Sequence, residues 1–208
     1  MNDDPIEDTI FSQNQNDSCP TSDQPNIKMH QAVYTLIDRK QLTTAYKDLT
    51  GRFPVRSAQG HEYVMVAYHY DANCILGVPV KNRTSTELTK AWEHLQSEFA
   101  RAGKAPEIWV LDNEVSDDLK KAFVTKQTTF QLVPPHSHRR NLAERAIQTW
   151  KNHFKAGLAT ADPNFPLTAW NHLIPQANIT LNLLRNARAN PALSAYAFIY
   201  GNFNFAST

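Results

Sequence analysis

The sequence predicts an α/β domain, in which helices flank a five-stranded mixed sheet. Residues 62–72 and 74–82 are rich in β-branched and aromatic side chains, and the tight-turn sequence Asp71-Ala72-Asn73 joins them. From residue 84 onward, segments of helical periodicity alternate with short apolar strands. This order predicts an antiparallel meander of three strands, followed by helix–strand units that extend the sheet in parallel.

The other three strands are shorter. Residues 48–55, "DLTGRFPV", contain Gly51 and Pro54, which is typical of a strand end or an edge. Residues 107–112, "EIWVLD", are almost continuously apolar and predict a strand buried on both faces. Residues 129–135, "TFQLVPP", predict the last strand of the sheet.

Four helices are expected. The first covers 84–102 and ends at Gly103, and the second covers 116–126 with Ser116 as its N-cap. A long helix opens at Asn141, and a further amphipathic helix covers 166–186. Apolar residues recur at helical spacing in the first helix (Leu88, Ala91, Trp92, Leu95, Phe99) and in the long helix (Ala143, Ile147, Trp150, Phe154, Leu158). We assign Trp92, Trp150 and Phe154 to the core, and 187–208 to a mostly irregular loop.

The chain divides into unequal parts. Residues 1–30 are polar and acidic and predict disorder, because they cannot bury enough apolar surface to offset the ordering entropy. Residues 31–46 are assigned to a linker, 47–160 to the core of the domain, and 161–208 to a C-terminal helical extension and loop of that core.

Composition narrows the class of protein. The 208 residues are 41% hydrophobic, and no apolar run approaches the ~20 residues of a membrane span. The first residues lack the basic-then-apolar order of a secretory signal. Two cysteines, Cys19 and Cys74, are too few for a disulfide scaffold or a thiolate zinc site and fit a reducing compartment.

The net charge of +1 conceals an uneven distribution. Residues 1–30 hold six acids against one lysine, a net charge of −5, whereas the rest holds 20 basic and 14 acidic residues, a net charge of +6. A basic body with a few clustered acids favours a polyanionic partner and a cation-requiring site, although an ordinary solvated surface would have the same charges.

Two acids stand where elements begin or end. Asp112 closes a buried strand, where ligands gather in α/β sheets, but Asp112 or Asn113 would also form an ordinary Asx-turn. Glu144 comes three residues after Asn141, which is close to a capping box. Asp48, at the expected start of the first strand, is uninformative alone.

Glu144 also lies beside the apolar stripe of its helix. Gln148, Lys151 and Lys155 continue that edge at helical spacing, so that one face presents an acid followed by cations. Such a face suits a metal site next to a phosphate track. Glu144 is therefore either a capping residue, a solvated ion-pair partner or a metal ligand.

Basic residues precede and follow Glu144. Arg139, Arg140, Lys151 and Lys155 are candidate phosphate contacts, and solvated helix charges are the alternative at even weight. His136 and His138 lie in a Pro-flanked loop without further nitrogen or sulfur partners, which favours a loop that faces the polyanionic partner over a metal pair.

Taken together, these segments resemble a known family. "DLTGRFPV", "VLDNE", "PPHSHRRNLAERAIQTWKNHFKAGL" and "LIPQANITLNLLRNARANPALSAYAFIYGNF" are similar to the integrase core of copia-type long-terminal-repeat retrotransposons, over most of the chain from Asp48 onward. The resemblance implies a ribonuclease H-like fold. It also implies that Asp48, Asp112 and Glu144 are the three catalytic, metal-binding acids, and that Asn141 and Arg145 match the family's residues around its glutamate.

The implied chemistry is metal-dependent DNA 3′-end processing and strand transfer. Two Mg²⁺ ions (Mn²⁺ being possible) would be held by the three acids, because hard cations prefer carboxylate oxygens. Arg139, Arg140, Asn141, Gln148, Lys151 and Lys155 would contact DNA. The resemblance implies that the partners are the DNA ends of the element, the target DNA and further copies of the chain, and that no membrane is involved. It also implies that the protein acts in the nucleus, after import from a cytoplasmic particle.

Three departures from the family pattern matter. Glu114 stands where retroviral-like integrases often have glycine, and the 31 residues between Asp112 and Glu144 are fewer than is usual in retroviral relatives. No histidine–cysteine zinc module precedes the core. The element's polymerase, capsid and C-terminal DNA-binding parts are also absent, so we expect a fragment of what the element encodes. Both an active and an inactive isolated fragment stay open. A non-catalytic remnant that binds DNA or a partner, and another ribonuclease H-like nuclease, stay open as alternatives.

Overall fold

The computed structural model of the protein describes residues 43–111, 115–132 and 142–207. The predicted disordered segment 1–30 and most of the predicted linker lie outside the described residues. So do the singled-out residues Asp112, Asn113, Glu114, His136, His138, Arg139, Arg140 and Asn141.

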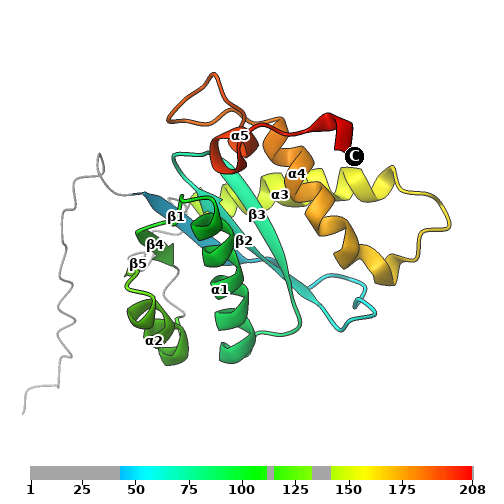
Figure 1. The fold of residues 1–208 in the computed structure, drawn as a ribbon. Coiled ribbons are helices and arrows are strands. Elements are labelled where there is room, and N and C mark those ends of the chain that lie inside the picture. The colour runs from blue at the N-terminus through cyan, green and yellow to red at the C-terminus, as the bar shows by residue number, and fades with distance from the viewer. Residues whose placement is uncertain (1–42, 112–114, 133–141, 208) are drawn as a thin grey trace, which may run out of the picture. The chain divides into compact units, whose positions relative to one another are not determined.

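The sheet has five strands in the order β3-β2-β1-β4-β5 (Figure 1). The strands are β1 (Thr44–Leu49), β2 (Tyr63–His69), β3 (Cys74–Val80), β4 (Ile108–Leu111) and β5 (Thr129–Leu132). β2 pairs antiparallel with β1 and β3, whereas β4 pairs parallel with β1 and β5. The predicted meander with parallel extensions is therefore confirmed.

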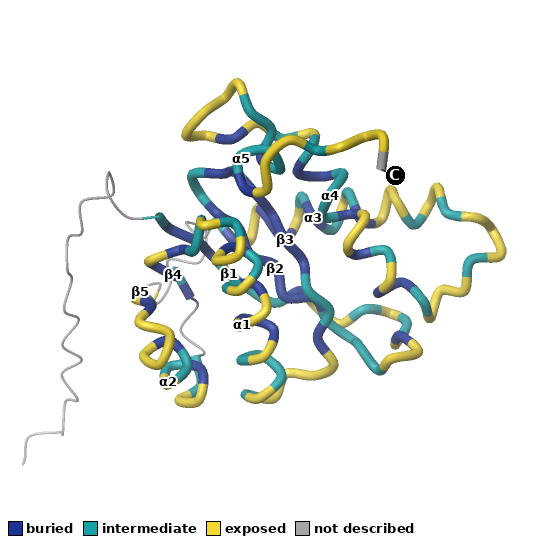
Figure 2. Tube along the Cα trace, in the orientation of Figure 1, coloured by how far each residue is buried: buried dark blue, intermediate teal, exposed yellow. Residues whose placement is uncertain are grey.

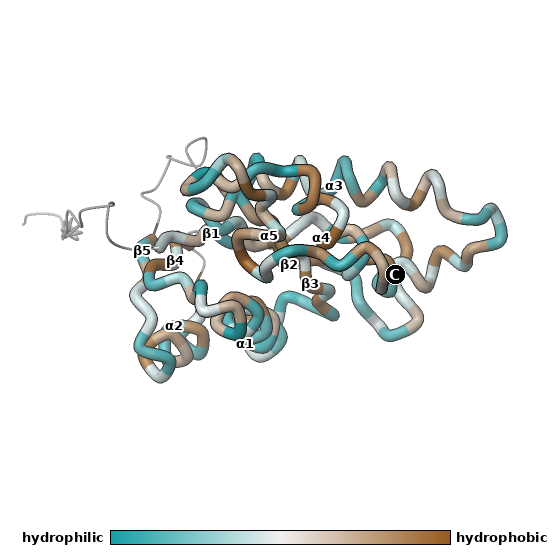
Figure 3. Tube along the Cα trace, turned by 45° about the horizontal axis from the view of Figure 1, so that its top comes forward, coloured by the Kyte–Doolittle hydropathy of each residue, from teal (hydrophilic) through white to brown (hydrophobic). Residues whose placement is uncertain are grey.

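Helices cover both faces of the sheet. α1 (Ser85–Arg101), α2 (Asp117–Thr125) and α5 (Ala195–Tyr200) share one hydrophobic cluster with the sheet, and α3 (Leu142–Ala159), η2 (Leu167–Leu173) and α4 (Ile174–Leu183) share the other. Successive β2 residues alternate between the two clusters, as the two-residue period of a strand requires. Figure 2 shows the buried strands between these layers, and the turned view of Figure 3 separates the α1–α2 layer from α3 and α4.

Most of the local predictions are confirmed. Trp92, Trp150 and Phe154 are fully or almost fully buried. Ser116 caps α2 by accepting a hydrogen bond from the Leu119 amide, and Gly103, at a φ of 66°, follows the end of α1. None of the described helices is long and apolar enough to span a membrane.

The first strand begins earlier than expected. β1 starts at Thr44, so Asp48 lies near its end and not at its start. Thr44 and Tyr46 are buried because β1 is a central strand, paired with β2 on one side and β4 on the other. Pairing with β2 and β4 extends β1 back to Thr44, and the local sequence pattern does not indicate this pairing.

The C-terminal region also differs from the prediction. The single helix expected over 166–186 is divided into the 3₁₀ helix η2 and the α-helix α4, with Pro175 in the first turn of α4, where its missing amide costs no helical bond. The expected loop contains α5, which Ser194 caps through the Ala197 amide and which ends before Gly201. Six residues are too few for helical periodicity to predict them.

Cys74 is buried, and burial raises the pKa of its thiol to about 12. The thiol is therefore protonated and unreactive at neutral pH.

Gly77, Trp150 and Asn178 form a junction between the edge strand β3 and the helices α3 and α4. A Cβ on Gly77 would lie 2.6 Å from Cε2 of Trp150. The side-chain Oδ1 of Asn178 accepts hydrogen bonds from the Gly77 amide and from Nε1 of Trp150, both at 2.9 Å, and Nδ2 of Asn178 donates to the Gly77 carbonyl. Asn182 makes the same pair of bonds to Ile75. Two asparagines thus satisfy backbone groups that an edge strand otherwise exposes.

This junction predicts opposite effects for two glycine substitutions. Gly77→Ala should lower the free energy of unfolding by about 1–3 kcal/mol, because its methyl group overpacks against Trp150. Gly157→Ala in α3 meets nothing within 4 Å and should raise it by up to about 1 kcal/mol, the helix-propensity difference. Urea unfolding measures both, and equal effects would contradict the packing at Gly77.

His69 makes stability depend on pH. The buried ring accepts the Ala72 amide at Nδ1, so that Nε2 carries the proton and donates to the Lys104 carbonyl. Burial lowers the pKa of His69. The folded state thus favours the neutral ring, and its stabilising contribution is complete above the unfolded pKa of about 6.5 and is lost as pH falls.

The free energy of unfolding should therefore decrease as the pH is lowered from 7.5 to 5, and His69→Gln should make this decrease smaller. A residual slope is expected from His61 and His153, whose pKa values burial also lowers. An unchanged slope in His69→Gln would show that His69 does not contribute to it.

Candidate catalytic and nucleic-acid site

Asp48 is the first of the three predicted catalytic acids along the chain. It is half-buried near the end of β1, and its Oδ1 accepts a hydrogen bond from the Leu49 amide at 2.6 Å. Tyr46, two residues earlier, packs in the cluster that α3 shares with the sheet. Because side chains two apart lie on the same face of a strand, Asp48 belongs to the α3 face.

Asp112, the second predicted acid, lies outside the described residues, as does the Asn113 of the alternative Asx-turn. The strand before it is described. β4 ends at Leu111, and it runs parallel to β1 with Tyr46 opposite Val110. The C-terminal ends of β1 and β4 therefore lie side by side, at the same end of these parallel strands.

Glu144, the third predicted acid, is an exposed residue in the first turn of α3. An acid at this position interacts favourably with the helix dipole, whether or not it also binds a ligand. Asn141, its expected capping partner, lies outside the described residues.

The helix α3 lies along the chain segment that leaves β1. Nζ of Lys151 is 4.0 Å from the position of a Cβ on Gly51, and the ring of Phe154 meets that of Phe53 edge-on with centroids 6.0 Å apart. Residue numbers increase in the same direction in both segments.

A basic cavity of about 210 Å³ lies where the two segments meet. Lys151 and Lys155, both predicted DNA contacts, line it together with Arg52. Apolar walls of Phe53, Pro54 and Phe154 complete it, with the glycine backbone at Gly51. Gln148, the remaining described candidate, is exposed on α3.

The structure adds Arg52 to the predicted set. Its guanidinium bonds Oε1 of Glu62 at 2.8 Å and is 66% exposed. Sequence reasoning missed it because 48–55 was interpreted as a strand, and only the packing of α3 brings Arg52 to the same cavity as the two lysines.

A second cavity, of about 360 Å³, adjoins Asp48 and the first turns of α1 and α2. Lys47 and Arg83 line it, and Ser85 Oγ lies 2.8 Å from Ser116 Oγ and 2.7 Å from the Asp118 carboxylate. Polar groups thus surround the end of β1.

The donor set suits a hard cation. Asp48 and Glu144 offer carboxylate oxygens, which Mg²⁺ prefers. In the described part of the chain, no group of three or more His, Cys, Asp or Glu side chains is arranged around a common metal position, and Asp112 is not in that part.

No protein-family model matches the chain, and no curated protein matches it. Solved structures do. The catalytic core domain of HTLV-2 integrase, in complex with magnesium and in a dimeric form, is 16% identical with a TM-score of 0.55, covering 76% of this chain and 95% of that one.

Two further structures are similar. In an intasome of simian T-cell lymphotropic virus with the PP2A regulatory subunit B56 gamma, the matching chain is 17% identical with a TM-score of 0.63, covering 85% of this chain and 62% of that one. The catalytic core domain of BIV integrase is 12% identical with a TM-score of 0.54, covering 75% and 92%. The fold is thus the ribonuclease H-like fold of retroviral integrase catalytic cores.

Proposed function

We propose that the protein is a retrotransposon integrase catalytic core of the copia type, which processes DNA 3′ ends and transfers them into a second DNA. The observation that carries the proposal is the position of α3 on the integrase-like sheet, because it brings the helix of Glu144 to the segment that follows Asp48.

Counting back along both segments supports a shared site. Glu144 lies two helical turns, or about 10 Å, before Lys151. Asp48 lies three extended residues, also about 10 Å, before Gly51, and the Thr50 amide bonded to the Val64 carbonyl keeps this chain beside β2. Since Lys151 meets Gly51 and both segments run in the same direction, Glu144 is expected level with Asp48.

Asp112 would complete the triad. It directly follows Leu111, the last residue of β4, which runs parallel to β1. We propose that Asp48, Asp112 and Glu144 together hold two Mg²⁺ ions. Bound there, the ions would activate the attacking water or DNA 3′-hydroxyl and stabilise the leaving oxygen.

The basic cavity supplies the second requirement. Lys151, Lys155 and Arg52 carry positive charge around a glycine backbone, which suits a DNA phosphate next to the acids. Phosphate contacts hold the strand in register without selecting its sequence. We also propose self-association, by analogy with the dimeric and trimeric forms named for the HTLV-2 core.

The triad predicts a common effect of three substitutions. Asp48→Asn, Asp112→Asn and Glu144→Gln should each weaken Mn²⁺ binding, followed by electron paramagnetic resonance, and reduce Mg²⁺-dependent strand transfer to background. Glu144→Gln should change the unfolding free energy by less than about 1 kcal/mol, the scale of an N-terminal helix interaction.

Glu93→Gln, an exposed acid on α1, is the matched control and should leave both measurements unchanged. Large lost stability with activity retained would make Glu144 a capping residue. Hydrolysis without joining would identify another ribonuclease H-like nuclease, and DNA binding without metal binding a non-catalytic remnant.

The basic cavity predicts a salt effect. Lys151→Ala and Lys155→Ala should each reduce the slope of log K against log salt for duplex DNA by about one unit, because one fewer counterion is released. Lys121→Ala, exposed on α2, should leave the slope unchanged. Equal slopes in all three variants would place the DNA track elsewhere.

A further inference from the structure

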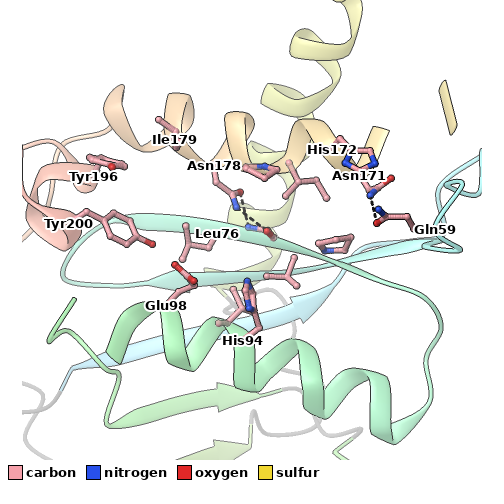
Figure 4. A pocket seen from close by; sticks show the side chains of 16 residues that line it. Gln59, Leu76, His94, Glu98, Asn171, His172, Asn178, Ile179, Tyr196 and Tyr200 are labelled. Carbon is pink, nitrogen blue, oxygen red and sulfur yellow. Dashed lines mark hydrogen bonds between the residues drawn. The ribbon is translucent and has the colours of Figure 1, made fainter. Parts of the chain in front are cut away.

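A further cavity lies away from the acids. It lies at the β3 edge of the sheet and has a volume of about 590 Å³, within the range of ligand sites (Figure 4). Its walls come from α1, β3, the η2–α4 segment and α5, which are far apart in the sequence. The proposed function uses none of them.

The base of the cavity is apolar, and the backbone hydrogen-bonding groups of Gly77 there already have partners. Leu76, Val78 and Ile174 supply hydrophobic surface, and Asn178 occupies the backbone groups of Gly77. Pro79, the next outward residue along β3, has no amide to donate. An added peptide strand would therefore find few hydrogen bonds at this edge, whereas a compact ligand with an apolar body would fit.

The polar side chains of the cavity include donors as well as acceptors. Glu98 is the one carboxylate among the described lining residues, which also include the imidazoles of His94 and His172 and the hydroxyls of Tyr196 and Tyr200. Arg101, which bonds Oε1 of Glu98, is 73% exposed, whereas Glu98 is only 24% exposed. Solvent therefore screens Arg101 more than it screens the carboxylate.

A second acceptor has no partner. Asn171 is 6% exposed and donates from Nδ2 to Gln59 at 2.9 Å. Its Oδ1 is buried, with no hydrogen-bond partner in the part of the chain that the structure describes. The accessible area of this oxygen is below 1 Å², so it lies behind the cavity wall and a ligand in the cavity does not contact it.

Two aromatic rings complete the wall. Tyr196 and Tyr200 on α5 have centroids 5.0 Å apart, and Figure 4 shows Tyr200 on the same side of the cavity as Glu98. Ring faces attract cations. Burial raises the pKa of Tyr200, so its hydroxyl stays neutral and adds no charge.

We propose that this cavity binds an amphipathic organic cation, with an aromatic or aliphatic body against the β3–α4 surface and an ammonium or guanidinium group at Glu98. The cation is either a free amine or the side chain of a partner's Lys or Arg beside an apolar residue. Both present the same chemistry to the cavity.

Three indoles test the charge preference on one aromatic body: cationic tryptamine, neutral 3-ethylindole and anionic indole-3-propionate. Binding to the ¹⁵N-labelled full chain is followed by NMR at Nδ2 of Asn178, which lines the cavity, and at Nε1 of Trp150, which donates to Oδ1 of the same Asn178 side chain. Tryptamine should bind at least roughly fivefold more tightly than the anion, the scale of one partly screened ion pair.

Glu98→Gln should abolish that preference and keep the neutral indole's affinity, whereas Glu93→Gln, on the exposed face of the same helix, should leave both unchanged. The amide spectrum of each variant verifies folding. No shift at Asn178 with any indole, a preference for the anion, or an unchanged preference in Glu98→Gln would each overturn the proposal. Tighter binding of an N-acetyl-Trp-Lys-amide than of tryptamine would identify a peptide source, and weaker binding a free amine.

Discussion

The contact between Trp150 and Gly77 holds the domain together at its edge. A glycine in β3 lets the indole of α3 lie directly on the strand backbone, and the Asn178 side chain from α4 bonds to both. One residue with no side chain thus sets how closely two helices approach the sheet. This contact limits how far α3 lies from β3, and the position of Glu144 depends on where α3 packs.

The candidate catalytic site depends on a second constraint, the parallel pairing of β1 and β4. Strands that run in the same direction end at the same edge, so acids after distant sequence segments can meet there. In α3, Lys151 and Phe154 lie against Gly51 and Phe53, in the segment that follows β1. The acids proposed to bind a metal and the cations proposed to bind phosphate are therefore expected on adjacent surfaces, as phosphodiester chemistry requires.

The two proposed sites differ in charge because different elements build them. The site at the end of β1 combines carboxylates with Lys151, Lys155 and Arg52, which suits a polyanion that brings its own negative charge. The cavity at β3 has a single carboxylate, in Glu98, among mostly apolar walls. Asn178 connects the regions physically, because it lines the cavity and also accepts the hydrogen bond of the α3 indole.

The sequence by itself determined the order of strands and helices, the fold class, and the core positions of Trp92, Trp150 and Phe154, since periodicity records which face of an element is buried. Through the family resemblance of its contiguous motifs, it also predicts the three acids Asp48, Asp112 and Glu144, and that assignment stays a prediction. Only the tertiary structure decided that β1 begins at Thr44, that Arg52 joins the two lysines, and that a cavity forms at β3. These features depend on contacts between residues far apart in the chain, and a local sequence pattern does not indicate which distant segment will pack against it.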